Sequence, residues 1–213
     1  MSRRAEYAEI TRQSIVDAAR RRFAEQGYVA TTIDQIAEDA RVAPKTVYAV
    51  AGGKRGLLNT VIRPWAEAAE VDDSLARMET MQSGSAVVGL LGATVRQLCE
   101  QLRDVIHLVT DAARQDEVAA SAVEHTSARI RHNLSLVAEH LRGMRELRSE
   151  ITTERATDIL QFYFRPDSYL HLVDQLGWAP EDAEKWLVEQ TTIALLQPPR
   201  RKVRSSNHRA LES

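Results

Sequence analysis

Cysteine, aromatic residues, glycine and proline are all scarce in this chain of 213 residues. The single Cys99 excludes a disulfide within the chain and fits the reducing cytoplasm, where we expect the protein to reside. With only nine glycines and six prolines, a composition rich in alanine, leucine, glutamate and arginine favours helices. The N-terminus has no apolar signal core and no apolar run reaches about 18 residues, so we expect no export and no contact with a membrane.

Charge of either sign is unevenly distributed, although the formal net charge is only −2. Residues 1–65 contain 11 Lys or Arg and 7 Asp or Glu, whereas residues 66–199 contain 12 and 22. The last segment, residues 200–213, is basic again, with 5 Lys or Arg and 1 Asp or Glu. A basic N-terminal region suits a partner that carries phosphates, but solvated helices can also acquire such a split by chance.

Helical periodicity runs through the first quarter of the chain. One amphipathic helix is expected over about residues 6–26. Thr32 and Gln35 then have the spacing of a capping box, which starts a second helix at residue 33. A bend at residues 41–43 precedes a short third helix, which Pro44 opens. The two short helices form a helix-turn-helix, a unit that can place a helix in the major groove of DNA.

The rest of the chain also reads as helices, without an alternating strand pattern or a repeat. Residues 51–53 break the third helix, and a fourth helix runs from Lys54 towards Glu70. A loop at residues 82–85 separates it from later helices. We expect these over residues 86–114 with a break near Leu102, 118–142, 148–176 with a kink at Pro166, and 180–196.

The N-terminal quarter resembles the DNA-binding domain of TetR-family transcriptional regulators. The matching motifs are Gly27-Tyr28 after an Ala-Ala-x-x-x-Phe helix, Thr31-Thr32-Ile33, Ile36-Ala37, Val42, Thr46-Val47-Tyr48 and Lys54 with Leu57-Leu58. The resemblance implies an all-α fold, in which an N-terminal three-helix helix-turn-helix domain precedes a larger helical ligand-binding and dimerisation domain. The corresponding ranges are 1–58, with the fourth helix from about residue 54 as the link, then 59–197, and a basic, disordered tail over 198–213.

The same resemblance implies what the protein does. We expect a bacterial, homodimeric repressor that binds a palindromic double-stranded DNA operator and releases it when an unidentified small-molecule effector enters the second domain. Four positions depart from the family pattern. Arg41 replaces a turn glycine, Ala43 and Gly53 lack a side chain that could cap a helix, and Ala51 replaces a large aromatic residue. We therefore expect a somewhat loosened DNA-binding domain.

Phosphate contacts supply most DNA affinity, and base contacts supply specificity. Tyr48 and Lys54 suit phosphates, and Lys45 and Thr46 suit bases or their flanking phosphates. Tyr48 could instead be a core aromatic residue, and the lysines could be solvated charges. Arg3 and Arg4 could form a flexible arm along a groove. The full predicted DNA-binding set is Thr32, Arg41, Pro44, Lys45, Thr46, Tyr48 and Lys54.

The second domain offers candidates for a ligand pocket and for a dimer face. The pocket candidates are Trp65, Leu91, Val95, His107, Asp111, Arg114 and Asn133. The dimer candidates are Ile159, Phe162, Tyr163, Trp186, Gln190 and Ile193. Asp104, His107 and Asp111 share one helical face, but an ordinary polar surface explains them better than a metal site, so we expect no metal and no cofactor.

Two other classes of function stay open at this point. One is an all-helical enzyme or small-molecule carrier, and the other is an interaction protein whose helix-turn-helix has lost DNA binding. The sequence contains no nucleophile elbow, phosphate-cradling glycine loop, HExxH or CxxC motif, so we expect no enzyme and no catalytic residue. Salt-dependent binding of DNA would separate a regulator from both alternatives.

Overall fold

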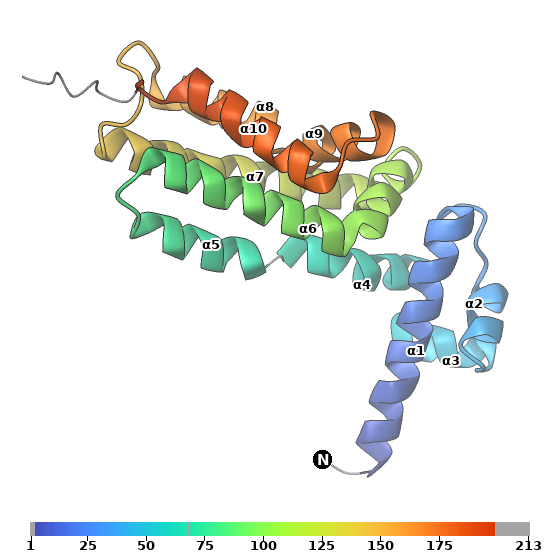
Figure 1. Cartoon of the computed structure of the whole chain (residues 1–213). Coiled ribbons are helices and arrows are strands. Elements are labelled where there is room, and N and C mark those ends of the chain that lie inside the picture. The colour runs from blue at the N-terminus through green and yellow to red at the C-terminus, as the bar shows by residue number, and fades with distance from the viewer. Residues whose placement is uncertain (1–2, 68, 199–213) are drawn as a thin grey trace, which may run out of the picture.

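The computed structural model describes residues 3–67 and 69–198, and these form helices joined by short loops. Helices α1 to α3, with the start of α4, make up a small head (residues 3–58), and the remaining helices form a layered body (residues 59–198) (Figure 1). No strand occurs in these two ranges, which confirms the all-α prediction. The helices are α1 (Arg3–Gln26), α2 (Ile33–Asp39), α3 (Pro44–Ala51), α4 (Lys54–Glu67), α5 (Ala69–Glu79), α6 (Gly84–Ala112), α7 (Glu117–Gly143), α8 (Thr153–Phe164), α9 (Pro166–Leu170) and α10 (Pro180–Leu195), with a π-helical turn, η1 (His171–Gln175), after α9.

The local signals in the head act as expected. The Thr32 hydroxyl accepts a hydrogen bond from the Gln35 amide at 3.3 Å, and the Thr32 amide donates to the Gln35 side chain at 2.8 Å, which confirms the capping box. Ala43, at the start of α3, makes no side-chain cap. A flexible arm at Arg3 and Arg4 was only one of two possibilities, the other being solvated charges, and the structure instead places both residues in α1, which begins at Arg3.

Apolar side chains from each helix of the head meet in one core. Ile15 and Phe23 of α1, Ile36 of α2, Val47 of α3 and Leu57 of α4 are almost completely buried. Burial of five such side chains from four helices fixes how α2 and α3 lie against α1 and α4. The head is therefore held together by packing, even where Ala43 leaves a helix start uncapped.

The segment after α4 differs from the prediction. Helical structure extends past the predicted end near Glu70, because residues Ala69–Glu79, named α5, are helical like Lys54–Glu67 of α4. Met78 is buried and Leu75 is partly buried in the core, and α5 packs along α6 (Figure 1). Burial against α6 and α7 stabilises this short and charged helix.

In the remaining helices the predicted break and kink are found, but one helix begins later in the chain than predicted. Helix α6 has non-helical angles at Leu102 (φ −119, ψ 18), where a break was expected, and Pro166 separates α8 from α9. The helix predicted from residue 148 instead begins at Thr153. The reason is tertiary: the Arg148 amide donates to the Leu195 carbonyl at 2.9 Å, and Leu147 forms an isolated antiparallel bridge with Leu196. These contacts hold the segment extended against the end of α10.

Arg41 occupies the bend of the helix-turn-helix with a left-handed backbone (φ 56), a conformation that costs a non-glycine residue roughly 1 kcal/mol. We expect Arg41→Gly to raise the free energy of unfolding by about 0.5–1 kcal/mol, measured by urea denaturation. Arg21→Gly is the matched control, because Arg21 is exposed within α1 and glycine there should cost about 1 kcal/mol. A loss of stability in Arg41→Gly would contradict the strain assigned to this bend.

Candidate nucleic-acid interface

The outer face of α3 presents polar and cationic side chains to solvent. Val47 is fully buried and anchors the helix, whereas Pro44, Lys45 and Tyr48 are exposed. Tyr48 has 58% of its surface exposed, so the alternative that it is a core residue is wrong. Its ring lies beside Gly53, where an added Cβ would come within 3.1 Å of Tyr48 Cε1. The glycine thus leaves room for the tyrosine at the junction of α3 and α4.

The other predicted DNA-binding residues around α3 differ in their exposure and in the hydrogen bonds that they already make. Arg41 is exposed in the bend, and Thr46 is half-buried on α3. Thr32 is exposed, but its backbone amide is already bonded to Gln35. The Thr32 hydroxyl is engaged as well, because it donates to the Gln35 side chain at 3.1 Å and accepts from the Gln35 backbone amide.

Lys54 is less free than the sequence suggests. Its ammonium donates to the Val29 carbonyl at 2.9 Å and lies 4.6 Å from the centre of the Tyr28 ring. Burial lowers the pKa of Lys54, and the nearby Asp116 carboxylate opposes this effect. An ammonium has three donor hydrogens, so one bond to a carbonyl leaves donors for a phosphate. In this structure Lys54 ties the α1–α2 loop to the start of α4.

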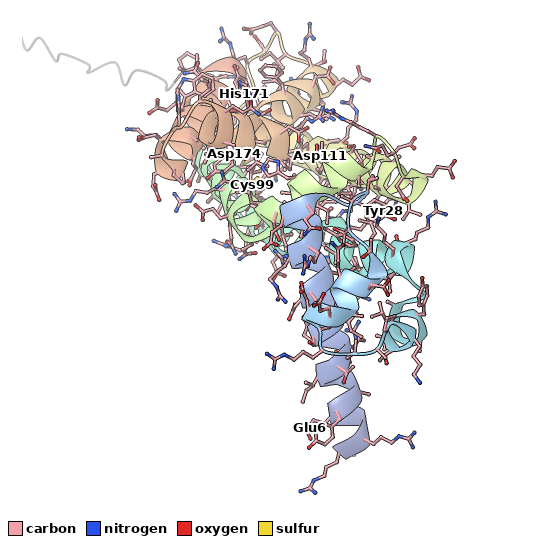
Figure 2. The ribbon with its side chains drawn as sticks, turned by 90° about the vertical axis from the view of Figure 1, so that its right-hand side faces the viewer. Glu6, Tyr28, Cys99, Asp111, His171 and Asp174 are labelled. Carbon is pink, nitrogen blue, oxygen red and sulfur yellow. The ribbon has the colours of Figure 1, made fainter. Side chains whose placement is uncertain are left out.

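The head contacts the body at the N-terminus of α7, through residues that include Tyr28, which Figure 2 labels. Asp116 caps α7 by accepting from the Val118 amide at 2.9 Å, and it also accepts from the Tyr28 hydroxyl at 3.2 Å. Arg55 of α4 forms an ion pair with the same carboxylate at 3.5 Å. Burial raises the pKa of Asp116, but these amide, hydroxyl and guanidinium partners outweigh it and keep the pKa below its ordinary value.

A second junction joins α1 to α6. The Arg20 guanidinium donates two hydrogen bonds to Asp104, at 2.5 and 2.6 Å, and the pair keeps the pKa of Asp104 below its ordinary value. One helical turn further, His107 lies 2.7 Å from Asp174. This neighbourhood also includes Asp111, which is exposed. Within residues 3–67 and 69–198, no group of three His, Cys, Asp or Glu side chains is placed to hold a metal ion.

The body contains a narrow, mainly apolar cavity of about 60 Å³ between α4, α5, α6 and α7. Four of the seven predicted pocket residues line it: Trp65, Leu91, Val95 and Asn133. His107, Asp111 and Arg114 do not, because they lie where α6 turns towards the head and the α6–α7 loop. The sequence analysis missed Thr126 and Arg129, which share one face of α7 with Asn133. Arg129 and Asn133 follow Thr126 by three and seven residues, a helical spacing from which the sequence analysis could have predicted this shared face.

The predicted dimer residues lie on the adjoining helices α8 and α10. Phe162 and Ile193 have 71% and 66% of their surfaces exposed, and Trp186 has 37%. Ile159, Tyr163 and Gln190 are half-buried. Tyr163 joins the two helices, because its ring stacks edge-on with Phe162 at 5.2 Å and with Trp186 at 6.4 Å. The two helices thus share an exposed apolar surface, which is the kind of surface that marks an interface.

An exposed recognition helix on a three-helix head, joined to a larger helical body with its own cavity, defines a helix-turn-helix protein. Residues 15–61 match the family model of the bacterial regulatory proteins of the tetR family. The N-terminal segment of the chain therefore carries a helix-turn-helix domain of the tetR type, as the sequence motifs predicted. No curated protein matches the chain.

Solved structures share the fold over most of the chain. SmeT, the repressor of the Stenotrophomonas maltophilia multidrug efflux pump SmeDEF, in complex with triclosan, is 18% identical with a TM-score of 0.72, over 89% of this chain and 93% of that one. A TetR transcription regulator from Haloarcula marismortui is 19% identical with a TM-score of 0.68, over 88% and 98%. NalD, the secondary repressor of the MexAB-OprM multidrug efflux pump in Pseudomonas aeruginosa, is 22% identical with a TM-score of 0.66, over 89% and 98%. Across the described ranges, none of the helices is long and apolar enough to cross a bilayer.

Proposed function

We propose that the protein is a homodimeric repressor that binds a palindromic operator and leaves it when a small molecule occupies the body cavity. The observation that carries the proposal is the exposed face of α3, where Lys45 and Tyr48 project from a helix that Val47 anchors in the core. A rigid helix with exposed polar side chains can enter a major groove, whereas a core helix cannot. Repression is supported by the named repressors SmeT and NalD, which have the same fold.

Helix α4 is the element through which a ligand would act on the head. It begins at Lys54, beside the α1–α2 loop, and carries Trp65 in the wall of the cavity. Arg55, near the start of α4, forms an ion pair with Asp116 at the N-terminus of α7, and α7 also lines the cavity. A ligand that separates α4 from α7 would therefore move the start of α4 and, with it, the recognition helix. The bound triclosan of the SmeT structure supports a body that accepts an organic molecule.

A twofold axis beside α8 and α10 would give the second recognition helix that a palindrome needs. Phe162 and Ile193 leave large apolar side chains exposed on these helices, and Tyr163 and Trp186 continue the surface between them. A cyclic dimer uses the same patch on both subunits, so a single apolar face is sufficient. Two heads held in this way would contact half-sites about one DNA turn apart, or a multiple of it.

We expect variants of the recognition helix to separate phosphate contacts from base contacts. Tyr48→Phe and Lys54→Ala should weaken binding to all DNA sequences, and Lys54→Ala should reduce the salt slope by about one. Lys45→Ala should relax specificity at one base position, with a cost of about 1–3 kcal/mol for the preferred site. Fluorescence anisotropy with specific and scrambled duplexes at several salt concentrations measures both effects. Lys185→Ala is the control, since Lys185 is exposed on α10, outside the head.

The decisive experiment is selection of duplexes from a random pool with the purified full-length chain. A symmetric consensus supports both sequence-specific binding and the dimer. Retention of DNA without a consensus would reduce the protein to a nonspecific binder. No retention at low salt would favour the alternative, a helical interaction or carrier protein whose helix-turn-helix no longer binds DNA.

A further inference from the structure

The cavity in the body contains polar atoms that have no partner. The Trp65 Nε1, the Thr126 hydroxyl and the Arg129 Nε are buried and make no hydrogen bond within the described residues. All three residues line the cavity, and Trp65 and Thr126 are only 6% and 2% exposed. Buried polar groups are nearly always hydrogen-bonded, because an unmade bond costs about 1–3 kcal/mol. Three such groups around one cavity indicate a bonding partner that enters from outside the chain.

The chemistry of these atoms restricts that partner. The indole nitrogen and the guanidinium Nε are donors without acceptor capacity, so the partner must offer acceptor oxygens. Arg129 is half-buried, its guanidinium is a cation, and no ion pair joins it to a carboxylate among the described residues. A cation in a largely apolar wall is costly unless an anion neutralises it. A planar guanidinium fork pairs best with a carboxylate, through two parallel hydrogen bonds.

The rest of the lining determines the remainder of the ligand. Met78, Leu91, Val95, Leu98 and Leu134 supply an apolar wall. The nearby hydroxyls satisfy each other, since Thr94 donates to Ser74 at 2.9 Å or to the Leu90 carbonyl at 2.8 Å. The lining thus combines one cationic side chain with a largely apolar surface. Methionine adapts easily to the shape of a ligand, so the small cavity can widen around an apolar chain.

We propose that this cavity binds an amphipathic monocarboxylic acid, with its carboxylate on Arg129, Trp65 and Thr126 and its hydrocarbon part among the leucines and valines. The inference rests on the proposed function, because it names the chemical class of the effector. Trp65 belongs to α4, whereas Thr126 and Arg129 belong to α7. The carboxylate therefore bridges the two helices that lead to Lys54, Arg55 and Asp116 at the head.

The test compares straight-chain acids with alcohols of the same length, on the full-length protein without DNA at pH 7.5. Isothermal titration calorimetry with hexanoate, octanoate and decanoate is set against 1-hexanol, 1-octanol and 1-decanol. We expect at least one acid to bind at least tenfold more tightly than its alcohol. Arg129→Gln should lower the affinity of that acid at least tenfold and leave the alcohol within about twofold. Equal binding of acid and alcohol, or no binding by any acid, would overturn the proposal.

Two further variants keep the test independent of folding defects. Trp65→Phe keeps an aromatic side chain but removes the Nε1 donor, and should weaken binding of the acid about threefold or more without changing binding of the alcohol. Arg114→Gln is the matched control, because Arg114 is exposed and does not line the cavity. If Arg114→Gln lowers the affinity for the acid as much as Arg129→Gln does, the acid does not bind at the proposed site and the proposal is wrong. Circular dichroism melts of each variant check that the fold is retained.

Release of the selected operator is measured separately, by anisotropy of labelled DNA. If the protein binds the acid but no DNA, the proposed regulatory function is refuted, whereas the proposed acid-binding site is supported. If the protein binds specific DNA but none of the acids, the proposed acid-binding site is refuted, whereas the proposed regulatory function is supported. Both proposals gain support if the acid lowers operator affinity in the unmodified chain but not in Arg129→Gln.

Discussion

Replacing Gly56 by alanine should destabilise the head and abolish DNA binding. Gly56 lies in the first turn of α4, and a Cβ there would come within 1.6 Å of the Ala51 carbonyl oxygen at the end of α3. A backbone carbonyl cannot rotate away as a flexible side chain can. The end of α3 and the start of α4 would have to separate, at a cost of about 3 kcal/mol in the free energy of unfolding. Urea denaturation and operator binding measure the two consequences.

Gly89→Ala is the control for this substitution. Gly89 also lies within a helix, α6, but an added Cβ there meets nothing within 4 Å. Alanine is a better helix former than glycine, so this variant should gain up to about 1 kcal/mol and bind DNA normally. If Gly56→Ala were as stable as Gly89→Ala, the close approach of α3 to α4 would be refuted.

Placing two negative charges on the exposed face of α8 and α10 should produce a monomer. In the double variant Phe162→Glu, Ile193→Glu, the new carboxylates would face their own copies, or other buried groups, across the proposed dimer. Like charges without partners in an interface are strongly unfavourable. A monomer has only one recognition helix, so operator affinity should fall by roughly 100-fold or more. Analytical ultracentrifugation and anisotropy measure the mass and the affinity.

Leu136→Glu serves as the matched variant for the dimer prediction. Leu136 is 40% exposed on α7 and does not belong to the predicted face, so the same change of chemistry should leave both mass and affinity unaltered. A double variant that stays dimeric would contradict the assignment of this face. A monomer that keeps full operator affinity would instead contradict the requirement for two heads.

The junctions between head and body illustrate what a sequence pattern cannot provide. Lys54 looks like a free phosphate ligand in the sequence, yet its ammonium reaches back 25 residues to the Val29 carbonyl. Asp116 caps α7 through its own neighbours, and it also accepts from the Tyr28 hydroxyl, 88 residues away. Such pairs depend on how α4 and α7 cross. A single sequence carries no signal for that crossing, because helical periodicity defines only which face of a helix is buried.

The sequence by itself determined the helices of the head, the capping box at Thr32, the bend at Arg41, the break at Leu102 and the tetR-type motifs of residues 15–61, because each depends on neighbours within a few residues. The tertiary structure alone decided that helix continues to Glu79 in α5, that the chain around Arg148 is not helical, and that Arg129 rather than His107 lines the body cavity. Those outcomes depend on contacts between helices that lie far apart in the chain. Long-range burial and hydrogen bonding override local propensity wherever the local pattern is weak.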